Sequence, residues 1–244
     1  MNITHAKDLT NDHVTYLIYG KQGVGKTSSL KSLPGKTLVI DIDHSSVVLQ
    51  GQQGMDIYNF DSSDAWQEWL NIASELVTNP AYSEHYDNLV IDNITELFRS
   101  SLENLGKNGK TSQGGVPAQS DYQKVDFMIL RAVRELKKLP MRLIFTAWEK
   151  EDQYIDESGQ TFNRAFPDLR HTIANNFMGL TDVIAHLIVI NKEGELHRGF
   201  ILQPDNHQMA KNRLDDRKGC KVDELWSINS TTTNKTSSDA PEAP

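Results

Sequence analysis

The sequence predicts an α/β fold in which a mostly parallel sheet is flanked by helices. Two observations indicate this class. Short apolar runs typical of buried strands alternate along the chain with segments of helical period. A glycine-rich turn also joins the first of these runs directly to a helical segment. We expect the core to end in a β-hairpin near the C-terminus.

Length and composition are those of one sizeable globular domain with a tail. The chain has 244 residues, of which 38% are hydrophobic and 24% are charged. No apolar run approaches the length that spans a bilayer, so we expect no membrane partner and a cytoplasmic location. The single cysteine, Cys220, excludes an internal disulfide framework. The net charge of −8 argues against a broadly basic DNA-binding surface, so any DNA contacts must come from local patches or a ring of subunits.

The first strand leads into a phosphate-binding loop. Residues 14–19 are apolar and β-rich, and residues 20–27 have the sequence GKQGVGKT, which satisfies the pattern G-x-x-x-x-G-K-[ST]. Glycines suit such a loop because a Cβ would obstruct the approach of backbone N–H groups to an anion. Lys26 can reach the β- and γ-phosphates, and the Thr27 hydroxyl can take one position around Mg²⁺. The residues expected to bind the nucleotide are Gly20, Gly23, Val24, Gly25, Lys26, Thr27 and Ser28.

A second strand pair and a Walker B strand are expected after this loop. A helix over residues 26–33 should stop at Pro34-Gly35, before strands over 37–43 and 55–60 and a helix that begins after residues 62–64. The strand over residues 86–92 ends in Asp92, whose carboxylate should hold the water shell of Mg²⁺ opposite Thr27. A helix over residues 93–105 should follow and end at Gly106.

The second half of the chain continues the same alternation. Its expected elements are a loop over 107–117, a helix over 121–139, a strand over 141–148, a hairpin over 149–166, a helix over 167–177 and hairpin strands over 181–190 and 196–202. We therefore expect one domain over residues 13–226, after a loose lead-in over residues 1–12. The tail over residues 227–244 has no apolar cluster to bury and should be disordered.

Five segments beyond the phosphate-binding loop (P-loop) carry a resemblance to a known family. They are VIDIDHSS (39–46), LVIDNITEL (89–97), IFTAWEK (144–150), FPDLRHTIANNFMGLTDVIAHL (166–187) and MAKNR (209–213). With the P-loop, they resemble the small phage RecA-core ATPases, the family that includes the fourth Sak type of single-strand annealing protein. The resemblance covers about residues 13–226.

The resemblance implies a RecA-like P-loop NTPase core that binds ATP and Mg²⁺ and hydrolyses ATP, with stimulation by DNA. It implies action on single-stranded DNA in phage recombination or annealing, in the host cytoplasm. A homo-oligomer that works with other recombination or replication proteins is also expected. In this family the strand over residues 144–150 ends in a polar residue that senses the γ-phosphate. Trp148 stands at that position here, so either Thr146 takes the role or the sensor is altered.

Three further residues take candidate catalytic roles from the resemblance. Asp43 would position the attacking water, although a carboxylate at a strand end also serves to cap a turn. Lys211 and Arg213 would form a basic finger that enters a neighbouring subunit's site, because arginine stabilises charge that develops on the γ-phosphate. A solvated basic turn is the alternative. Candidate DNA contacts are Lys107, Lys110, Arg131, Arg134 and Lys138, of which the last three also fit a solvated helix face.

Three other function classes share parts of this pattern. A nucleotide or small-molecule kinase is disfavoured because no arginine-rich lid segment is present. A GTPase is disfavoured because Asn191-Lys192-Glu193-Gly194 lacks the carboxylate that would bind guanine, so a hairpin turn explains it better. A helicase loader or scaffold that binds ATP as a structural ligand remains open. The histidines lack metal-ligand spacing, so Mg²⁺ is the expected metal.

Overall fold

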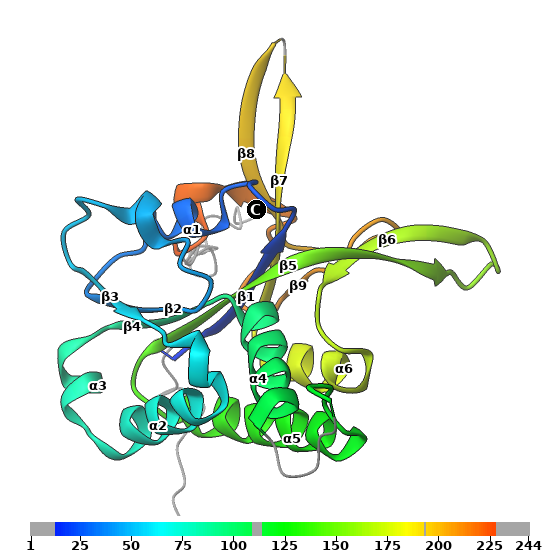
Figure 1. The fold of residues 1–244 in the computed structure, drawn as a ribbon. Helices are drawn as coiled ribbons and strands as arrows, with labels where there is room; N and C mark the ends of the chain where they lie inside the picture. The colour runs from blue at the N-terminus through cyan, green and yellow to red at the C-terminus, as the bar shows by residue number, and fades with distance from the viewer. Residues whose placement is uncertain (1–12, 109–113, 193, 228–244) are drawn as a thin grey trace, which may run out of the picture.

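The computed structural model describes residues 13–108, 114–192 and 194–227 (Figure 1). The predicted lead-in over residues 1–12, Lys110 and nearly all of the predicted tail lie outside these residues. Within the described residues, ten strands form one sheet and helices cover both of its faces. No described helix has both the length and the apolar composition needed to cross a membrane.

The centre of the sheet is parallel, as the sequence predicts. The strand order is β10-β8-β7-β1-β5-β4-β2-β3, with β6 paired to β5 and β9 paired to β7. The parallel strands are β1 (Thr15–Gly20), β2 (Thr37–Asp41), β3 (Met55–Asn59), β4 (Asn88–Asp92), β5 (Arg142–Ile155) and β7 (Val183–Lys192). The antiparallel strands are β6 (Thr161–Pro167), β8 (Glu195–Ile201), β9 (Lys211–Asn212) and β10 (Gly219–Lys221). The predicted fold class, including its C-terminal hairpin, is confirmed.

Two hydrophobic clusters hold the helices on the sheet. One face packs against α2 (Ala65–Thr78), α4 (Ile94–Asn108), α5 (Gln119–Leu136) and α6 (His171–Leu180), as Figure 1 shows. Two further α-helices are short, α1 (Lys26–Ser29) and α3 (Ala81–His85). Because side chains alternate along a strand, β1 directs Leu17 and Tyr19 into one cluster and Tyr16 and Ile18 into the other. Burial on both faces explains why this strand is apolar without alternation.

Two hairpins extend past the end of β1. The last residue pair between β1 and β7 is Tyr19 with His186, yet β7 continues to Lys192. We call residues 149–155 with 161–167 the β5–β6 arm, and residues 187–192 with 195–201 the β7–β8 arm. The two arms point in different directions from the sheet (Figure 1). The loop after β1 therefore lies at the base of a fork.

Two predicted helix boundaries are wrong. Gly106 lies inside α4 rather than at its end, and a Cβ there would come within 2.8 Å of the Gly115 carbonyl oxygen. The glycine is thus required by the close approach of another segment. The helix expected from residue 167 begins at His171, because Pro167 still pairs with Glu149 as the last residue of β6.

Candidate active site

The loop predicted to bind phosphate connects β1 to α1 and is closely packed against β7. A Cβ on Gly20 would lie 2.6 Å from the carbonyl oxygen of Leu187, so only glycine fits there. Gly25 has a φ of 106°, a conformation that other residues rarely adopt. The glycines are therefore needed for the shape of the loop as well as for the approach of an anion.

Lys26 is almost fully buried beneath this loop. Its Nζ donates hydrogen bonds to the carbonyl oxygens of Gly20 at 2.9 Å and Lys21 at 3.1 Å. Burial lowers the pKa of Lys26, whereas the nearby carboxylates of Asp92 and Asp43 act in the opposite direction. The ammonium makes no ion pair with a described residue, so its charge is available to an anion.

Thr27, in the first turn of α1, meets Asp92, the last residue of β4, as predicted for a Mg²⁺ site. Thr27 Oγ1 donates a 2.7 Å hydrogen bond to Asp92 Oδ2, and Ser45 Oγ lies 3.3 Å from the same Thr27 hydroxyl. Asp92 Oδ1 accepts a hydrogen bond from Thr146. Burial raises the pKa of Asp92 to about 6, although the hydrogen bonds from Thr146 and Thr27 lower it. Carboxylate and hydroxyl oxygens are suitable ligands for Mg²⁺ or its water shell.

Asp43 faces the same site from the turn after β2. Its carboxylate accepts hydrogen bonds from the Asn93 side-chain amide and, at 3.2 Å, from the Ser45 backbone N–H. The sequence reasoning missed Asp41, which holds this turn by accepting the N–H groups of Ser45 at 3.0 Å and Ser46 at 3.1 Å. Two carboxylates therefore fix the turn, and one of them also reaches the cavity.

A cavity of about 230 Å³ joins these groups. Its lining includes Lys26, Thr27, Asp43, Ser45, Asp92 and Trp148. On the expected sensor strand, Trp148 lines this cavity with the Arg99 guanidinium 4.7 Å from its ring centre, while Thr146 is fully buried against Asp92. The sensor role of Thr146 stays a prediction.

Lys211 and Arg213 lie at the opposite end of the sheet from the P-loop. β9 pairs with the first residues of β7, Val183 and Ile184, whereas the P-loop follows the last residue of β1. Lys211 Nζ donates to the Met178 carbonyl oxygen at 2.6 Å, and an Arg213 Nη atom lies 3.6 Å from Asp182. The chain does not bring this pair to its own P-loop, so a finger role requires a second subunit.

The candidate DNA contacts are spread over two helices. Lys107 forms an ion pair with Glu103 on α4, and Lys138, just after α5, forms one with Glu135 at 2.6 Å. Arg131 and Arg134 are exposed on α5.

Two features of the site had no signal in the sequence. Arg198, on β8, donates from Nε to the Val24 carbonyl oxygen at 2.9 Å. Glu149 and His186 form a buried pair, 2.9 Å apart, and the histidine ring stacks on Tyr19 with ring centres 4.4 Å apart. This pair joins the bases of the two arms and borders a cavity of about 500 Å³. Each contact links residues distant in sequence, which local patterns do not reveal.

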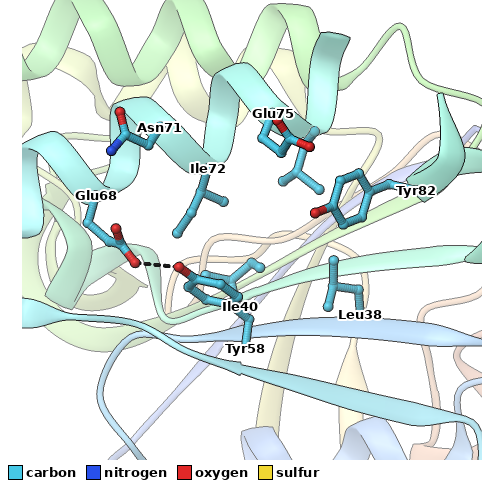
Figure 2. Close-up of a pocket in the computed structure, with 9 residues that line it drawn as sticks. Leu38, Ile40, Tyr58, Glu68, Asn71, Ile72, Glu75 and Tyr82 are labelled. Atoms are coloured by element: carbon cyan, nitrogen blue, oxygen red, sulfur yellow. Dashed lines mark hydrogen bonds between the residues drawn. The ribbon is translucent and has the colours of Figure 1, made fainter. Parts of the chain in front are cut away.

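Figure 2 shows a separate cavity of about 360 Å³ between α2 and the strands β2 and β3. Its floor is apolar, and at one end Tyr58 donates a 2.5 Å hydrogen bond to Glu68. This hydrogen bond is the main reason that the pKa of Tyr58 is raised to about 12. Its lining holds two carboxylates, Glu68 and Glu75, and no cationic side chain, so it disfavours phosphate. The P-loop cavity is therefore the candidate nucleotide site.

Comparisons with known proteins identify the family of this chain. A KaiC-like protein from Pyrococcus horikoshii aligns with 13% identity and a TM-score of 0.42, over 78% of this chain and 77% of its own. The flagellar accessory protein FlaH from Methanocaldococcus jannaschii aligns with 10% identity and a TM-score of 0.45, over 85% and 83%. Among curated proteins there is no significant match. The profile of the family described as "AAA domain" matches residues 12–214. The match spans most of the chain, so this protein belongs to the AAA domain family and is a P-loop ATPase domain.

Proposed function

We propose that this protein is a Mg²⁺-dependent ATPase that acts on single-stranded DNA in recombination or annealing. The observation that carries the enzymatic part is the convergence of Lys26, Thr27 and Asp92 on one cavity. Such a site needs one cation for phosphate and oxygen ligands for a metal, and it has both.

The residues of the loop have separable roles in this proposal. Lys26 exchanges the carbonyl oxygens of Gly20 and Lys21 for oxygens of the β- and γ-phosphates. Thr27 and Asp92 would hold Mg²⁺ or its water shell. When bound, the metal neutralises charge that develops on the β- and γ-phosphates. Asp92 favours the metal above pH 6, where its carboxyl group is ionised.

Asp43 is the candidate for orienting the attacking water. Its carboxylate lines the cavity and is held in place by Asn93 and the Ser45 N–H. Because an aspartate side chain is short, its position depends on this turn, and so on Asp41. The rest of the machinery, Arg213 with Lys211, would come from a neighbouring subunit of a homo-oligomer.

The DNA part of the proposal is supported by the resemblance to phage annealing ATPases and by the exposed cations of α5, Arg131 and Arg134. A specific observation favours a second candidate, a loader-like protein that works through a protein partner. Apolar side chains are exposed on both arms: Ile155 by 65%, Leu196 by 66% and Ile190 by 43%. Apolar side chains exposed on projecting hairpins are accessible to a protein partner.

The test is ATP turnover by the full chain with and without single-stranded DNA, over a range of roughly 50 to 200 mM salt. The proposal expects stimulation that weakens as salt increases, because phosphate contacts release counterions. Neutralising Lys107 and Lys110 together should lower DNA affinity and the salt slope. Turnover that ignores DNA but responds to a replication or recombination protein would favour the loader. No turnover under any condition would reject an ATPase.

A further inference from the structure

The β7–β8 arm reaches over the P-loop of its own chain. Near its base, the Leu187 carbonyl oxygen packs against Gly20 so closely that a Cβ there would lie at 2.6 Å. Two residue pairs further along the hairpin, where Arg198 pairs with Val189, Arg198 Nε donates to the Val24 carbonyl oxygen at 2.9 Å. A Cβ on Gly25 would lie 3.3 Å from the same Nε atom. The arm therefore places a guanidinium group directly against the middle of the loop.

The charge of Arg198 has no acidic partner among the described residues. By contrast, Arg99, Arg170 and Arg217 each have an ion pair with an aspartate, at 2.6 to 2.8 Å. A guanidinium group carries five N–H donors, and the bond to Val24 uses one of them. The side chain is also exposed to solvent. An unpaired cation with open donors is thus held beside a loop shaped for an anion.

The arm offers an apolar side chain on the same side. Leu196 precedes Arg198 by two residues on β8, so both side chains lie on one face of the strand. Leu196 is 66% exposed. A cation close to the loop and an apolar group further out match the two ends of a nucleotide, its phosphates and its base.

We propose that Arg198 binds the α- and β-phosphates of the nucleotide held by the P-loop of the same chain. This inference rests on the proposed ATP site. Backbone N–H groups of a P-loop cradle the α- and β-phosphates, while its lysine reaches the β- and γ-phosphates. Arg198 reaches the loop beside Val24 and Gly25, within the segment whose backbone cradles phosphate, and not at Lys26. The planar fork of arginine suits paired phosphate oxygens.

This role differs from that expected of Arg213. A residue that holds the α- and β-phosphates supports ADP and ATP equally, within one subunit. A finger from a neighbour acts on the γ-phosphate and changes turnover more than affinity. Arg198 should therefore affect nucleotide affinity whether or not the protein assembles.

The experiment measures binding of ADP, ATP and inorganic tripolyphosphate to the full chain by calorimetry with Mg²⁺, for wild type, Arg198→Met and Arg198→Gln. Both variants should bind ADP and ATP about tenfold or more weakly, and tripolyphosphate should lose a similar factor. The control is Lys31→Met, which removes an exposed positive charge just after α1 without touching the loop and should bind like wild type. Thermal melts confirm that each variant is folded.

Four results would overturn the assignment. Unchanged ADP affinity in both folded variants would reject Arg198 as a binding residue. Weaker ADP binding with unchanged tripolyphosphate binding would move the contact to the nucleoside. An equal loss in Lys31→Met would show a general charge effect only. A wild-type chain that binds no nucleotide at all would reject the proposed ATP site itself, and this inference with it.

Discussion

Charged side chains lie at both ends of the parallel sheet, but only at one end does each charge have a partner of opposite charge. At the amino end, Asp182 accepts the Thr15 N–H at 3.0 Å and lies 3.6 Å from both Lys137 and Arg213. Its charge is balanced by cations of the same chain. At the carboxyl end, Lys26 bonds to carbonyl oxygens and Asp92 accepts hydroxyl groups, so neither charge is balanced directly.

The pKa shifts of Lys26 and Asp92, at the carboxyl end, reflect this lack of partners. Burial lowers the pKa of Lys26 and raises that of Asp92, so each group is destabilised in its charged form. Bound phosphate and Mg²⁺ are the opposite charges that would relieve both. A ligand site thus keeps its charges apart and uncompensated, whereas a structural site pairs them.

The largest expected effect comes from the carboxyl end. Lys26→Ala should lower ATP turnover by about a thousandfold or more, because it removes the only described cation inside the P-loop cavity. The fold should remain, since the lysine makes bonds to loop carbonyls and no ion pair. Steady-state ATPase assays and circular dichroism measure the two effects. Wild-type turnover in the folded variant would place catalysis elsewhere.

Asp92→Asn should remove the Mg²⁺-dependent part of turnover, lowering it by about a hundredfold. The amide keeps the shape and can still accept from Thr27 or Thr146, but it lacks the charge that holds the metal. Titrating Mg²⁺ in the assay measures this dependence. If the Mg²⁺ requirement is unchanged, Asp92 is only a structural partner of the two threonines.

The amino end is tested by Arg213→Ala. Because Arg213 is far from its own P-loop, the variant should bind ATP normally but turn it over more slowly, by about a hundredfold. Wild-type turnover per subunit should rise with protein concentration. Mixing Arg213→Ala with Lys26→Ala chains should restore some activity, because interfaces with an intact loop and an intact finger form again. No recovery, with turnover independent of concentration, would leave Arg213 as a structural partner of Asp182.

Local sequence patterns predict the elements whose structure depends on residues close together in the sequence. The P-loop was found because glycines and Lys26 stand at fixed spacing, and Asp92 because it ends a strand buried on both faces. Both lie at the carboxyl ends of parallel strands, β1 and β4, with β5 between them. The fold class followed from the same alternation of strands and helices.

Residues that depend on distant contacts were not predictable. The contact between Arg198 and Val24 joins positions 174 residues apart, and no spacing rule relates a hairpin to the P-loop. Gly106 wrongly predicts the end of α4, because the rule for glycine at helix ends takes no account of a distant segment such as Gly115 packing against the helix. The two arms were expected as hairpins, but their position on both sides of the P-loop follows from β1 ending earlier than β5 and β7.

The smallest predicted effect concerns the stability of the nucleotide-free protein, and it tests whether the carboxyl end is uncompensated. The pKa of Asp92 is about 6 in the folded chain, against 3.8 for an ordinary aspartate. A raised pKa means that the folded state holds its proton more tightly than the unfolded state, so stability is lost as pH rises toward 6. Counted from below pH 3.8, where the group is protonated in both states, the loss of stability above pH 6 should total about 3 kcal/mol.

Asp92→Asn has no such titration and serves as the matched control. Between pH 5 and 7.5, wild type should therefore lose about 1 kcal/mol relative to this variant in denaturant unfolding. Mg²⁺ with ADP should reduce the loss, because the metal compensates the carboxylate. A stability difference that does not change with pH would mean that Asp92 is already compensated, as Asp182 is at the amino end.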